Sequence, residues 1–253
     1  MEYGLIGEKL GHSYSKIIHE KLADYTYDLC PLTKDEFKVF MTEKKFRAIN
    51  VTIPYKKDVL PYLDVIDEKA KRIGAVNTII NNDGHLTGYN TDYFGFYYTL
   101  KQHKIEIMNQ KVLVLGNGGA SLAVIAVLQD LQAGEILTVK YKEEPNTITY
   151  EEAAENHSDA TLIINTSPIG MYPNVDASPI DLSPYKQLSA VVDIIYNPKV
   201  TKFMQQAMDQ GVLAVNGIEM LVAQAKYAVE YFLDTEIEDS VIDTISNELN
   251  QNF

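Results

Sequence analysis

The stretch KVLVLGNGGAS, residues 111–121, joins a short apolar run to a cluster of glycines and the start of a helix. Residues 112–115 are apolar and partly β-branched, which favours a strand buried on both faces. Three glycines follow at once: Gly116, Gly118 and Gly119. Residues 120–131 then carry apolar side chains nearly all round a helix. Strand, glycine turn and helix in this order are typical of a turn that binds a pyrophosphate through free N–H groups and the helix dipole.

The match to the dinucleotide-binding motif G-x-G-x-x-G is incomplete, because Ser121 stands where the third glycine is expected. Ala120 and Ser121 are still small enough for close packing of the helix against the strand. A glycine turn in another kind of α/β protein has the same form, so this turn alone leaves both interpretations open.

The composition is that of an ordinary globular chain. Its 253 residues are enough for one large domain or two modest ones, with 46% hydrophobic and 23% charged residues. The formal net charge of -13 argues against nucleic acid or an anionic membrane surface as a partner. It leaves room for a local basic pocket that holds an anionic metabolite.

Cysteine use and hydropathy indicate the compartment. Cys30 is the single cysteine, which excludes an internal disulfide and suits a reducing cytoplasm. No cysteine and histidine cluster has zinc-binding spacing, so we expect no metal site. No apolar run reaches the length of a membrane span, and the N-terminus lacks a basic and apolar signal pattern. We expect a cytoplasmic protein with a small-molecule substrate and without nucleic-acid or membrane partners.

The first hundred residues contain two further stretches with candidate functional side chains. A polar loop follows the strand predicted at Tyr3–Ile6, and its serines Ser13 and Ser15 precede a predicted helix at Lys16–Leu22. Either serine is a candidate helix cap, and two hydroxyls at a helix start are also suited to hold a carboxylate.

Ala48–Ile53 fits a buried parallel strand that Pro54 stops, and Lys56 comes directly afterwards. Ligand sites of open parallel sheets lie beyond the carboxyl ends of strands, which favours a functional lysine here. A solvated lysine beside Lys57 is the alternative. The amphipathic pattern of residues 58–72 predicts a helix.

A hairpin is predicted next. Val76–Ile80 and His85–Tyr89 read as strands, and Asn81-Asn82-Asp83-Gly84 between them is a strong turn signal. The second strand leads into residues 90–92, Asn-Thr-Asp, and a predicted helix at 93–101.

These segments together resemble the shikimate dehydrogenase family over nearly the whole chain and in the right order. The motifs that carry the resemblance are GLIGEKLGHSYS (4–15), NVTIPYK (50–56), GAVNTI (74–79), GYNTDYFG (88–95), LGNGGAS (115–121), INTSPIGM (164–171), DIIYNP (193–198) and NGIEMLVAQA (216–225).

The resemblance implies an α/β fold of two domains, an N-terminal α/β substrate domain and a Rossmann-type dinucleotide-binding domain. It places the substrate-binding and catalytic domain at residues 1–100, with C-terminal helices at 217–253 that return to it. The cofactor domain then spans residues 101–216.

The resemblance also implies roles for single residues. Lys56 and Asp92 match the family's catalytic pair. The implied substrate-binding residues are Ser13 and Ser15 for the carboxylate, Thr52, Asn77, Asp92 and Gln224 for ring hydroxyls, and Tyr196. The implied cofactor-binding residues are Gly116, Asn117, Gly118, Gly119 and Ala120 at the pyrophosphate, with Thr166, Ile194 and Gly217.

The chain departs from the family where the strand predicted at Glu135–Val139 ends. In the family, an arginine here stacks on adenine and contacts the 2′-phosphate of NADP. This chain has Lys140-Tyr141-Lys142 instead, with no arginine among them. A lysine serves a phosphate as a point charge, without the bidentate fork of arginine. An NAD enzyme prefers an acidic residue at this strand end, and Glu143 is slightly late for that role. We expect NADP(H) to be favoured only weakly over NAD(H).

The function that the resemblance implies is the reversible NADP(H)-dependent reduction of 3-dehydroshikimate to shikimate, in the chorismate pathway to the aromatic amino acids. The enzyme is expected as a monomer or homodimer. Two alternatives are an NAD-dependent quinate/shikimate dehydrogenase and a non-catalytic shikimate-pathway sensor on the same fold. The presence of Lys56 and Asp92 argues against a sensor, which needs no proton transfer.

Overall fold

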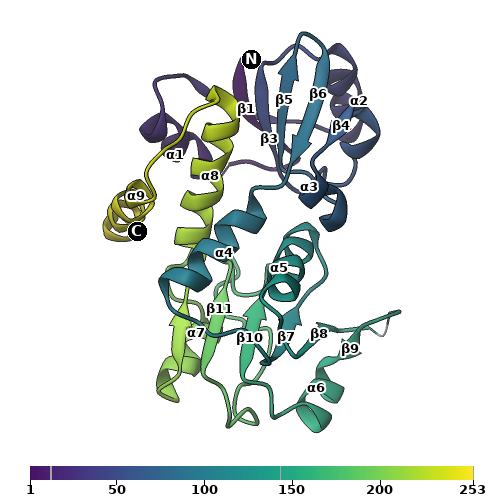
Figure 1. Cartoon of the computed structure of the whole chain (residues 1–253). Coiled ribbons are helices and arrows are strands. Elements are labelled where there is room, and N and C mark those ends of the chain that lie inside the picture. Colours follow the sequence, from purple (N-terminus) through teal and green to yellow (C-terminus); the bar gives the residue numbers. More distant parts are fainter. Residues whose placement is uncertain (12, 143, 253) are drawn as a thin grey trace. The chain divides into compact units, whose positions relative to one another are not determined.

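The computed structural model describes residues 1–11, 13–142 and 144–252. The chain divides into two compact units, and Figure 1 labels most of their elements. Unit 1 comprises Met1–Gly95 and Leu221–Ile245, and unit 2 comprises Phe96–Met220 and the segment from Ser246 onward. Three helices contribute residues to both units: α4 (Asp92–Gln102), α8 (Ile218–Leu233) and α9 (Ser240–Asn252).

Unit 1 is built on a six-stranded mixed sheet in the order β2-β1-β3-β5-β6-β4. β1 pairs in parallel with β2 and β3, whereas β5 is antiparallel to both β3 and β6. Its elements are β1 (Tyr3–Gly7), α1 (Ser15–Leu22), β2 (Tyr27–Pro31), α2 (Lys34–Glu43), β3 (Ala48–Val51), the 3₁₀ helix η1 (Leu60–Tyr62), β4 (Val65–Ile66), α3 (Glu68–Ile73), β5 (Thr78–Asn82) and β6 (His85–Tyr89).

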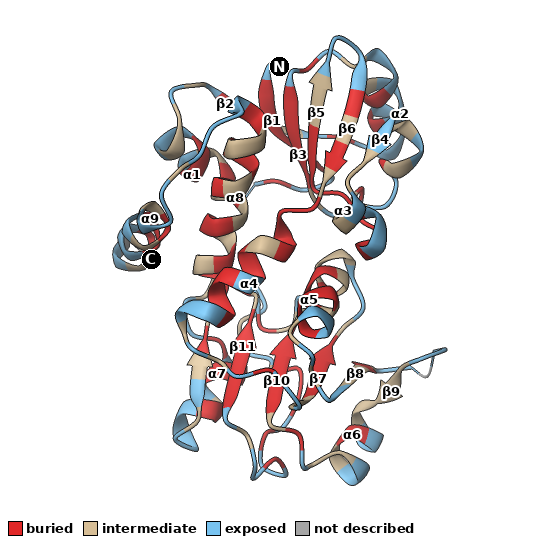
Figure 2. Cartoon of the chain, in the orientation of Figure 1, coloured by how far each residue is buried: buried red, intermediate tan, exposed pale blue. Residues whose placement is uncertain are grey.

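Both faces of this sheet are covered, and its central strands are buried (Figure 2). Ile49 and Val51 of β3 pack on one face with Phe37 of α2. Ala48, one residue out of phase, packs on the other face with Phe232 of α8. The alternation follows from the two-residue period of a strand, so each strand feeds both cores.

The predicted hairpin is confirmed, but its turn is shorter than the predicted 81–84, because Asn81 and Asn82 belong to β5 and pair with β6. β5 and β6 pair from Thr78 to Tyr89, and the turn between them contains Asp83 and Gly84, both with positive φ (52° and 91°). Two left-handed residues match the twist of a two-residue hairpin, and this requirement explains the Asp-Gly pair.

The helix predicted over residues 58–72 is wrong. The segment forms η1, the short strand β4 and only then α3. Asp64 accepts a hydrogen bond from Leu86 N–H and Asp67 N–H donates to Gly88 O, so pairing with β6 outweighs local helix propensity. The strand predicted at Ala48–Ile53 is shorter than expected, because β3 ends at Val51.

Unit 2 is an all-parallel sheet in the order β12-β11-β10-β7-β8-β9. Counted from β7, this is the doubly wound order of a Rossmann fold, which confirms the predicted fold class. Its elements are β7 (Lys111–Leu115), α5 (Gly119–Asp130), β8 (Glu135–Lys140), β9 (Ile148–Thr149), α6 (Tyr150–Asn156), β10 (Leu162–Asn165), β11 (Ala190–Asp193), α7 (Lys202–Asp209) and β12 (Leu213–Val215).

The core of unit 2 joins strands and helices around the centre of the sheet. Leu113, Ile163 and Val191 of three neighbouring strands pack with Phe203 of α7 and Ala153 of α6. Within the described part of the chain, no helix has both the length and the apolar character needed to cross a bilayer.

Asp193 is a fully buried carboxylate at the end of β11. Its Oδ1 accepts hydrogen bonds from Asn165 Nδ2 (3.0 Å) and Ile195 N–H (3.1 Å), and its Oδ2 accepts one from the Thr201 hydroxyl (2.7 Å). Burial raises the pKa of Asp193 to about 6, although these three donors oppose the shift.

This pKa predicts a pH-dependent contribution to stability. The folded-state pKa lies above the unfolded value of about 4, so the contribution is complete below pH 4 and is lost as the pH rises through 6. We expect the free energy of unfolding of the wild type, relative to Asp193→Asn, to fall by about 2–3 kcal/mol between pH 4 and pH 7. Denaturant unfolding of both proteins across this range measures the difference, and a difference that does not change with pH would contradict the assignment.

Candidate active site

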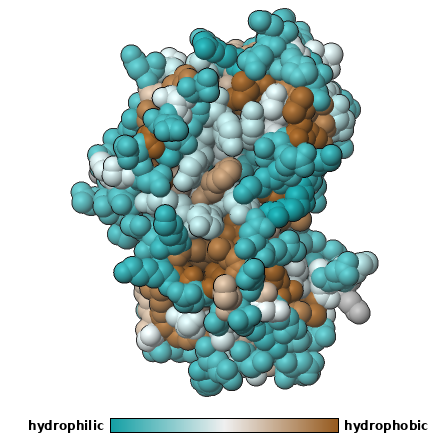
Figure 3. Space-filling model, in the orientation of Figure 1, coloured by the Kyte–Doolittle hydropathy of each residue, from teal (hydrophilic) through white to brown (hydrophobic). Residues whose placement is uncertain are grey.

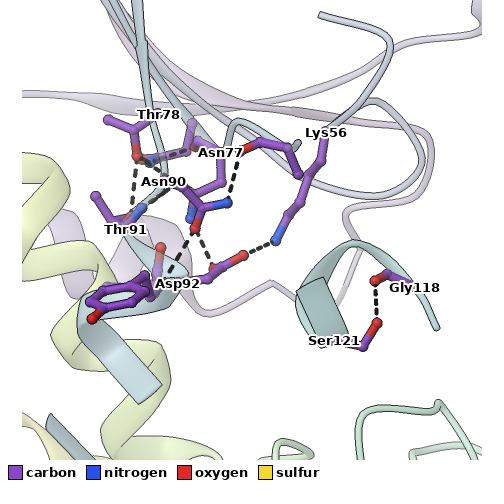
Figure 4. Close-up of polar contacts among 12 residues, drawn as sticks. Lys56, Asn77, Thr78, Asn90, Thr91, Asp92, Gly118 and Ser121 are labelled. Atoms are coloured by element: carbon purple, nitrogen blue, oxygen red, sulfur yellow. Dashed lines mark hydrogen bonds and ion pairs between the residues drawn. The ribbon is translucent and has the colours of Figure 1, made fainter. Parts of the chain in front are cut away.

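A largely buried ion pair lies beyond the carboxyl end of β3. The ammonium group of Lys56 is 2.5 Å from Oδ2 of Asp92 (Figure 4). Their side chains are 13% and 8% exposed, so the pair is largely shielded from solvent. Asp92 begins α4, where the helix dipole favours a negative charge. An ammonium group has three N–H donors, so Lys56 can bind this carboxylate and still donate to a second oxygen.

Asn77 completes the surroundings of the carboxylate. Its Nδ2 donates to Oδ1 of Asp92 at 2.9 Å, and its Oδ1 accepts the backbone N–H of Thr91 at 2.7 Å. Both oxygens of Asp92 therefore have a partner. The structure brings together three of the residues singled out in the sequence, whereas Lys57 is exposed.

The two serines precede and begin α1. The hydroxyl oxygen of Ser13 accepts the N–H of Ser15 at 3.3 Å. The N-cap residue of α1 is Tyr14, whose side chain makes no capping hydrogen bond, so neither serine is itself the N-cap residue. Ser13 nevertheless accepts the first N–H of the helix. Ser15 is buried and Ser13 half-buried. The neighbouring His12 lies outside the described residues.

The remaining predicted substrate residues lie on separate elements. Thr52 follows β3, and its N–H donates to Ile6 O of the adjacent strand β1 at 2.9 Å. Gln224 lies on α8, where its side-chain amide donates to Leu221 O of the same helix. Tyr196 is half-buried and follows β11 in unit 2.

The glycine turn of unit 2 joins β7 to α5, at the point where strand order reverses between β7 and β10. Gly116 has a φ of +98°, and a Cβ there would lie 3.2 Å from the Thr166 hydroxyl, so the turn itself requires glycine. Thr166 Oγ1 donates to Leu115 O at 2.7 Å, which ties the ends of β7 and β10 together. Ser121 Oγ donates to Gly118 O at 2.6 Å (Figure 4).

Gly118 is a different case. It is the N-cap of α5 in an ordinary extended conformation, and a Cβ built there meets no heavy atom within 4 Å. The first N–H groups of a helix lack partners within the helix, so open space at this point suits an anion. The residues therefore fit a dinucleotide pyrophosphate.

A carboxylate lies beside this turn. Glu144 accepts a hydrogen bond from Asn117 Nδ2 at 3.2 Å and forms an ion pair with Lys140 at the end of β8. Tyr141 is exposed, and its ring lies against that of Tyr150 in a tilted arrangement, with centroids 4.6 Å apart and an interplanar angle of 36°. Glu143, which the sequence suggested as the acidic residue, lies outside the described residues. Sequence reasoning missed Glu144, although it is the adjacent acidic residue.

Ile194 and Gly217 are packed directly against each other. Gly217 N–H donates to Ile195 O at 3.0 Å, and a Cβ on Gly217 would lie only 2.0 Å from the carbonyl oxygen of Ile194. Only glycine fits here. In the described residues, no group of three histidine, cysteine or acidic side chains is placed to hold a metal ion.

Known proteins resemble this chain over nearly all its length. A family profile described as the shikimate dehydrogenase substrate binding domain matches residues 5–79. A protein of Clostridium beijerinckii named shikimate dehydrogenase (NADP(+)) is 41% identical over 256 residues, covering 94% of each chain.

Solved structures agree with this match. A chorismate mutase/shikimate 5-dehydrogenase fusion protein from Clostridium acetobutylicum has a TM-score of 0.92 and 40% identity, covering 99% of this chain and 97% of that one. The shikimate 5-dehydrogenase of Thermus thermophilus, in complex with NADP(H) and shikimate, has a TM-score of 0.87 and 27% identity, covering 98% and 99%. With relatives this similar across both units, the chain belongs to the shikimate dehydrogenase family.

Proposed function

We propose that this chain catalyses the reversible reduction of 3-dehydroshikimate to shikimate with NADP(H). The observation that carries the proposal is the largely buried contact between Lys56 and Asp92. Reduction of a ketone requires a hydride at the carbon and a proton at the oxygen. The nicotinamide supplies the hydride when it is bound, and the protein supplies the position and the proton.

Lys56 is the proton donor in this proposal. Its ammonium group donates a hydrogen bond to the ketone oxygen, and the proton moves to that oxygen as the alcohol forms. In the direction of oxidation, neutral Lys56 takes the hydroxyl proton back. Asp92 orients the lysine, stabilises its charge and accepts a hydrogen bond from a substrate hydroxyl.

The other site residues bind and orient. The hydroxyls of Ser13 and Ser15 hold the substrate carboxylate, while Thr52, Asn77 and Gln224 bind ring hydroxyls, with Tyr196 also toward the substrate. Unit 2 holds the cofactor through the turn at residues 116–120, with Thr166, Ile194 and Gly217. In this proposal unit 1 is the substrate domain and unit 2 the cofactor domain.

The enzyme is proposed to work in the cytoplasm as a monomer or homodimer, without a nucleic-acid or membrane partner. The formal net charge of -13 supports the exclusion of polyanions, because phosphate backbones and anionic lipids attract basic surfaces.

Substitution of Lys56 tests the proton donor. We expect Lys56→Ala to lower kcat by roughly 10²–10⁴-fold, the usual range for a positioned acid–base group, with a much smaller change in KM. Lys57→Ala is the matched control, because Lys57 is adjacent in sequence and exposed, and it should be nearly silent. Steady-state kinetics with 3-dehydroshikimate and NADPH give both values. Near-normal kcat in Lys56→Ala, or damage only in Lys57→Ala, would remove the assignment.

Two glycine substitutions test the cofactor turn without relying on turnover. Gly118→Ala should cost at most about 1 kcal/mol of stability, since alanine fits and is only a poorer N-cap. It should raise the Kd for NADPH, measured by NADPH fluorescence, about tenfold or more, because the methyl group occupies the space a pyrophosphate approaches. Gly217→Ala should instead destabilise the fold by about 1–3 kcal/mol through its clash with Ile194. Normal NADPH binding by Gly118→Ala would speak against the turn as the pyrophosphate site.

Cofactor preference depends on the charges beside the turn. Lys140 and Lys142 favour a 2′-phosphate, whereas Glu144 repels it and already pairs with Lys140. We expect a modestly lower KM for NADPH than for NADH. Glu144→Gln should lower the KM for NADPH by about two- to fivefold and change the KM for NADH less. This is the size of effect expected when one partly exposed charge is removed. A clear preference of the wild type for NADH would contradict this reading.

The Glu144 contact also favours one second candidate, an NAD-dependent quinate/shikimate dehydrogenase. An acidic residue near the glycine turn is the usual partner of the ribose hydroxyls of NAD. Turnover of quinate with NAD in the same assay would separate this activity from the main proposal.

A further inference from the structure

Behind the ion pair, buried side chains of unit 1 form a continuous series of hydrogen bonds that reaches β2. Asn77 Nδ2 donates to Asp92 Oδ1 at 2.9 Å, and the Thr78 hydroxyl donates to Asn77 Oδ1 at 3.0 Å (Figure 4). Asn50 Nδ2 donates to Thr78 Oγ1 at 3.1 Å, and the Tyr27 hydroxyl donates to Asn50 Oδ1 at 2.7 Å. Because β1 lies between β2 and β3, the Tyr27 side chain reaches across one strand.

Backbone groups fix the direction of this series at both ends. Asn50 Nδ2 also donates to the carbonyl oxygen of Asn77 at 3.1 Å, and a carbonyl can only accept. The amide oxygen of Asn50 therefore faces Tyr27, whose pKa burial raises well above its usual value, so the hydroxyl keeps its proton and donates. At the other end, Thr91 N–H can only donate to Asn77 Oδ1, so Asn77 Nδ2 must face Asp92.

The far end of the series is anchored by a stacked pair of rings. The His19 ring lies 3.9 Å from that of Tyr27 at an interplanar angle of 14°, and its Nδ1 is 2.8 Å from the Tyr25 hydroxyl. Burial lowers the pKa of His19 to about 3, so the stack stays neutral. Tyr27 and His19 are fully buried. A Tyr27 ring that turned away would leave the amide oxygen of Asn50 without the donor that it has here.

We infer that Tyr27, Asn50 and Thr78 are positioning residues for proton transfer by Lys56 and Asp92. They act through Asn77. With its amide fixed, Asn77 holds one carboxylate oxygen and leaves the other for the lysine. If the carboxylate of Asp92 is held less firmly, the ammonium group of Lys56 can move out of hydrogen-bonding position relative to the ketone oxygen. Proton transfer is sensitive to such displacements. The inference rests on the proposed function, since the series has this task only if the ion pair carries the proton.

Two matched tyrosine variants test the inference. Tyr27→Phe removes the hydroxyl from the series. Tyr55→Phe removes an equally buried hydroxyl that donates to Leu32 O, also at 2.7 Å, outside the series. Tyr55 precedes Lys56 in sequence. A general loss of packing in the core would therefore lower kcat in Tyr55→Phe at least as much as in Tyr27→Phe. We expect kcat to fall about tenfold in Tyr27→Phe, the rate equivalent of about one hydrogen bond, and to be retained in Tyr55→Phe.

A second pair of variants guards against a folding defect. Thr78→Val keeps the shape of threonine without its hydroxyl, and Thr78→Ser keeps the hydroxyl. We expect Thr78→Val to lower kcat more than it raises the KM for shikimate, and Thr78→Ser to restore kcat. A structural role alone would lower thermal stability in both tyrosine variants without separating their kcat values.

The side-chain amide signal of Asn77 in ¹⁵N–¹H NMR spectra gives a readout that does not depend on turnover. It should move in Tyr27→Phe and Thr78→Val and stay in place in Tyr55→Phe. Equal kcat values in the two tyrosine variants with an unmoved Asn77 signal would overturn the inference. If Lys56→Ala keeps its kcat, the proposed function fails whatever the NMR result. If Lys56→Ala is inactive while the two tyrosine variants have equal kcat values, only the positioning role fails.

Discussion

The ion pair between Lys56 and Asp92 constrains much of unit 1, because two charges have been taken largely out of water. Such burial costs several kcal/mol per ion, and mutual attraction offsets this cost only with good geometry and additional hydrogen bonds. Asp92 receives one such bond from Asn77 and lies at the start of α4, where the dipole favours its charge. A protein in which a buried ion pair is replaced by apolar residues of the same volume is often equally stable, so stability alone does not explain the presence of these two residues. The proposed proton transfer by Lys56, in a site shielded from water, gives a reason for both.

The register of the β5–β6 hairpin sets the geometry of this pair. Lys56 and Asp92 are 36 residues apart, and Asn77 comes from a third segment. Asn77 N–H donates to Tyr89 O, and the next residue, Thr78, pairs with Tyr89, so the two ends of the hairpin meet where α4 begins. A slip of one residue would turn Asn77 to the opposite face of the sheet and remove its contact with Asp92. A short turn of two residues therefore controls a contact at the opposite end of the hairpin.

Local patterns in the sequence were enough for the parts of the fold that local physics determines. The apolar run before Gly116 predicted a buried strand, and the Asp83-Gly84 pair predicted a hairpin turn, because both depend on neighbouring residues alone. The helix expected over residues 58–72 failed since pairing with β6 is a long-range effect that amphipathic spacing does not report. Asn50 and Thr78 lie within the motifs that carried the family resemblance, yet no local signal connects either of them to Tyr27, which is 23 residues from Asn50.

The glycine turn shows why spacing alone left two interpretations open. Gly116 is required by its own backbone, whereas Gly118 has an ordinary φ of −73° and empty space around it, so neither backbone conformation nor packing requires glycine there. Glycine loses more conformational freedom on folding than alanine does, and such a residue at a helix start is more easily explained by a ligand that approaches the backbone. Beside it, Glu144 occupies Lys140 and contacts Asn117 of the same turn. A 2′-phosphate that binds here must compete with that carboxylate for the lysine, whereas a ribose hydroxyl can donate to it. We therefore expect selectivity for the phosphate to be limited by this internal ion pair as well as by the absence of the family's arginine.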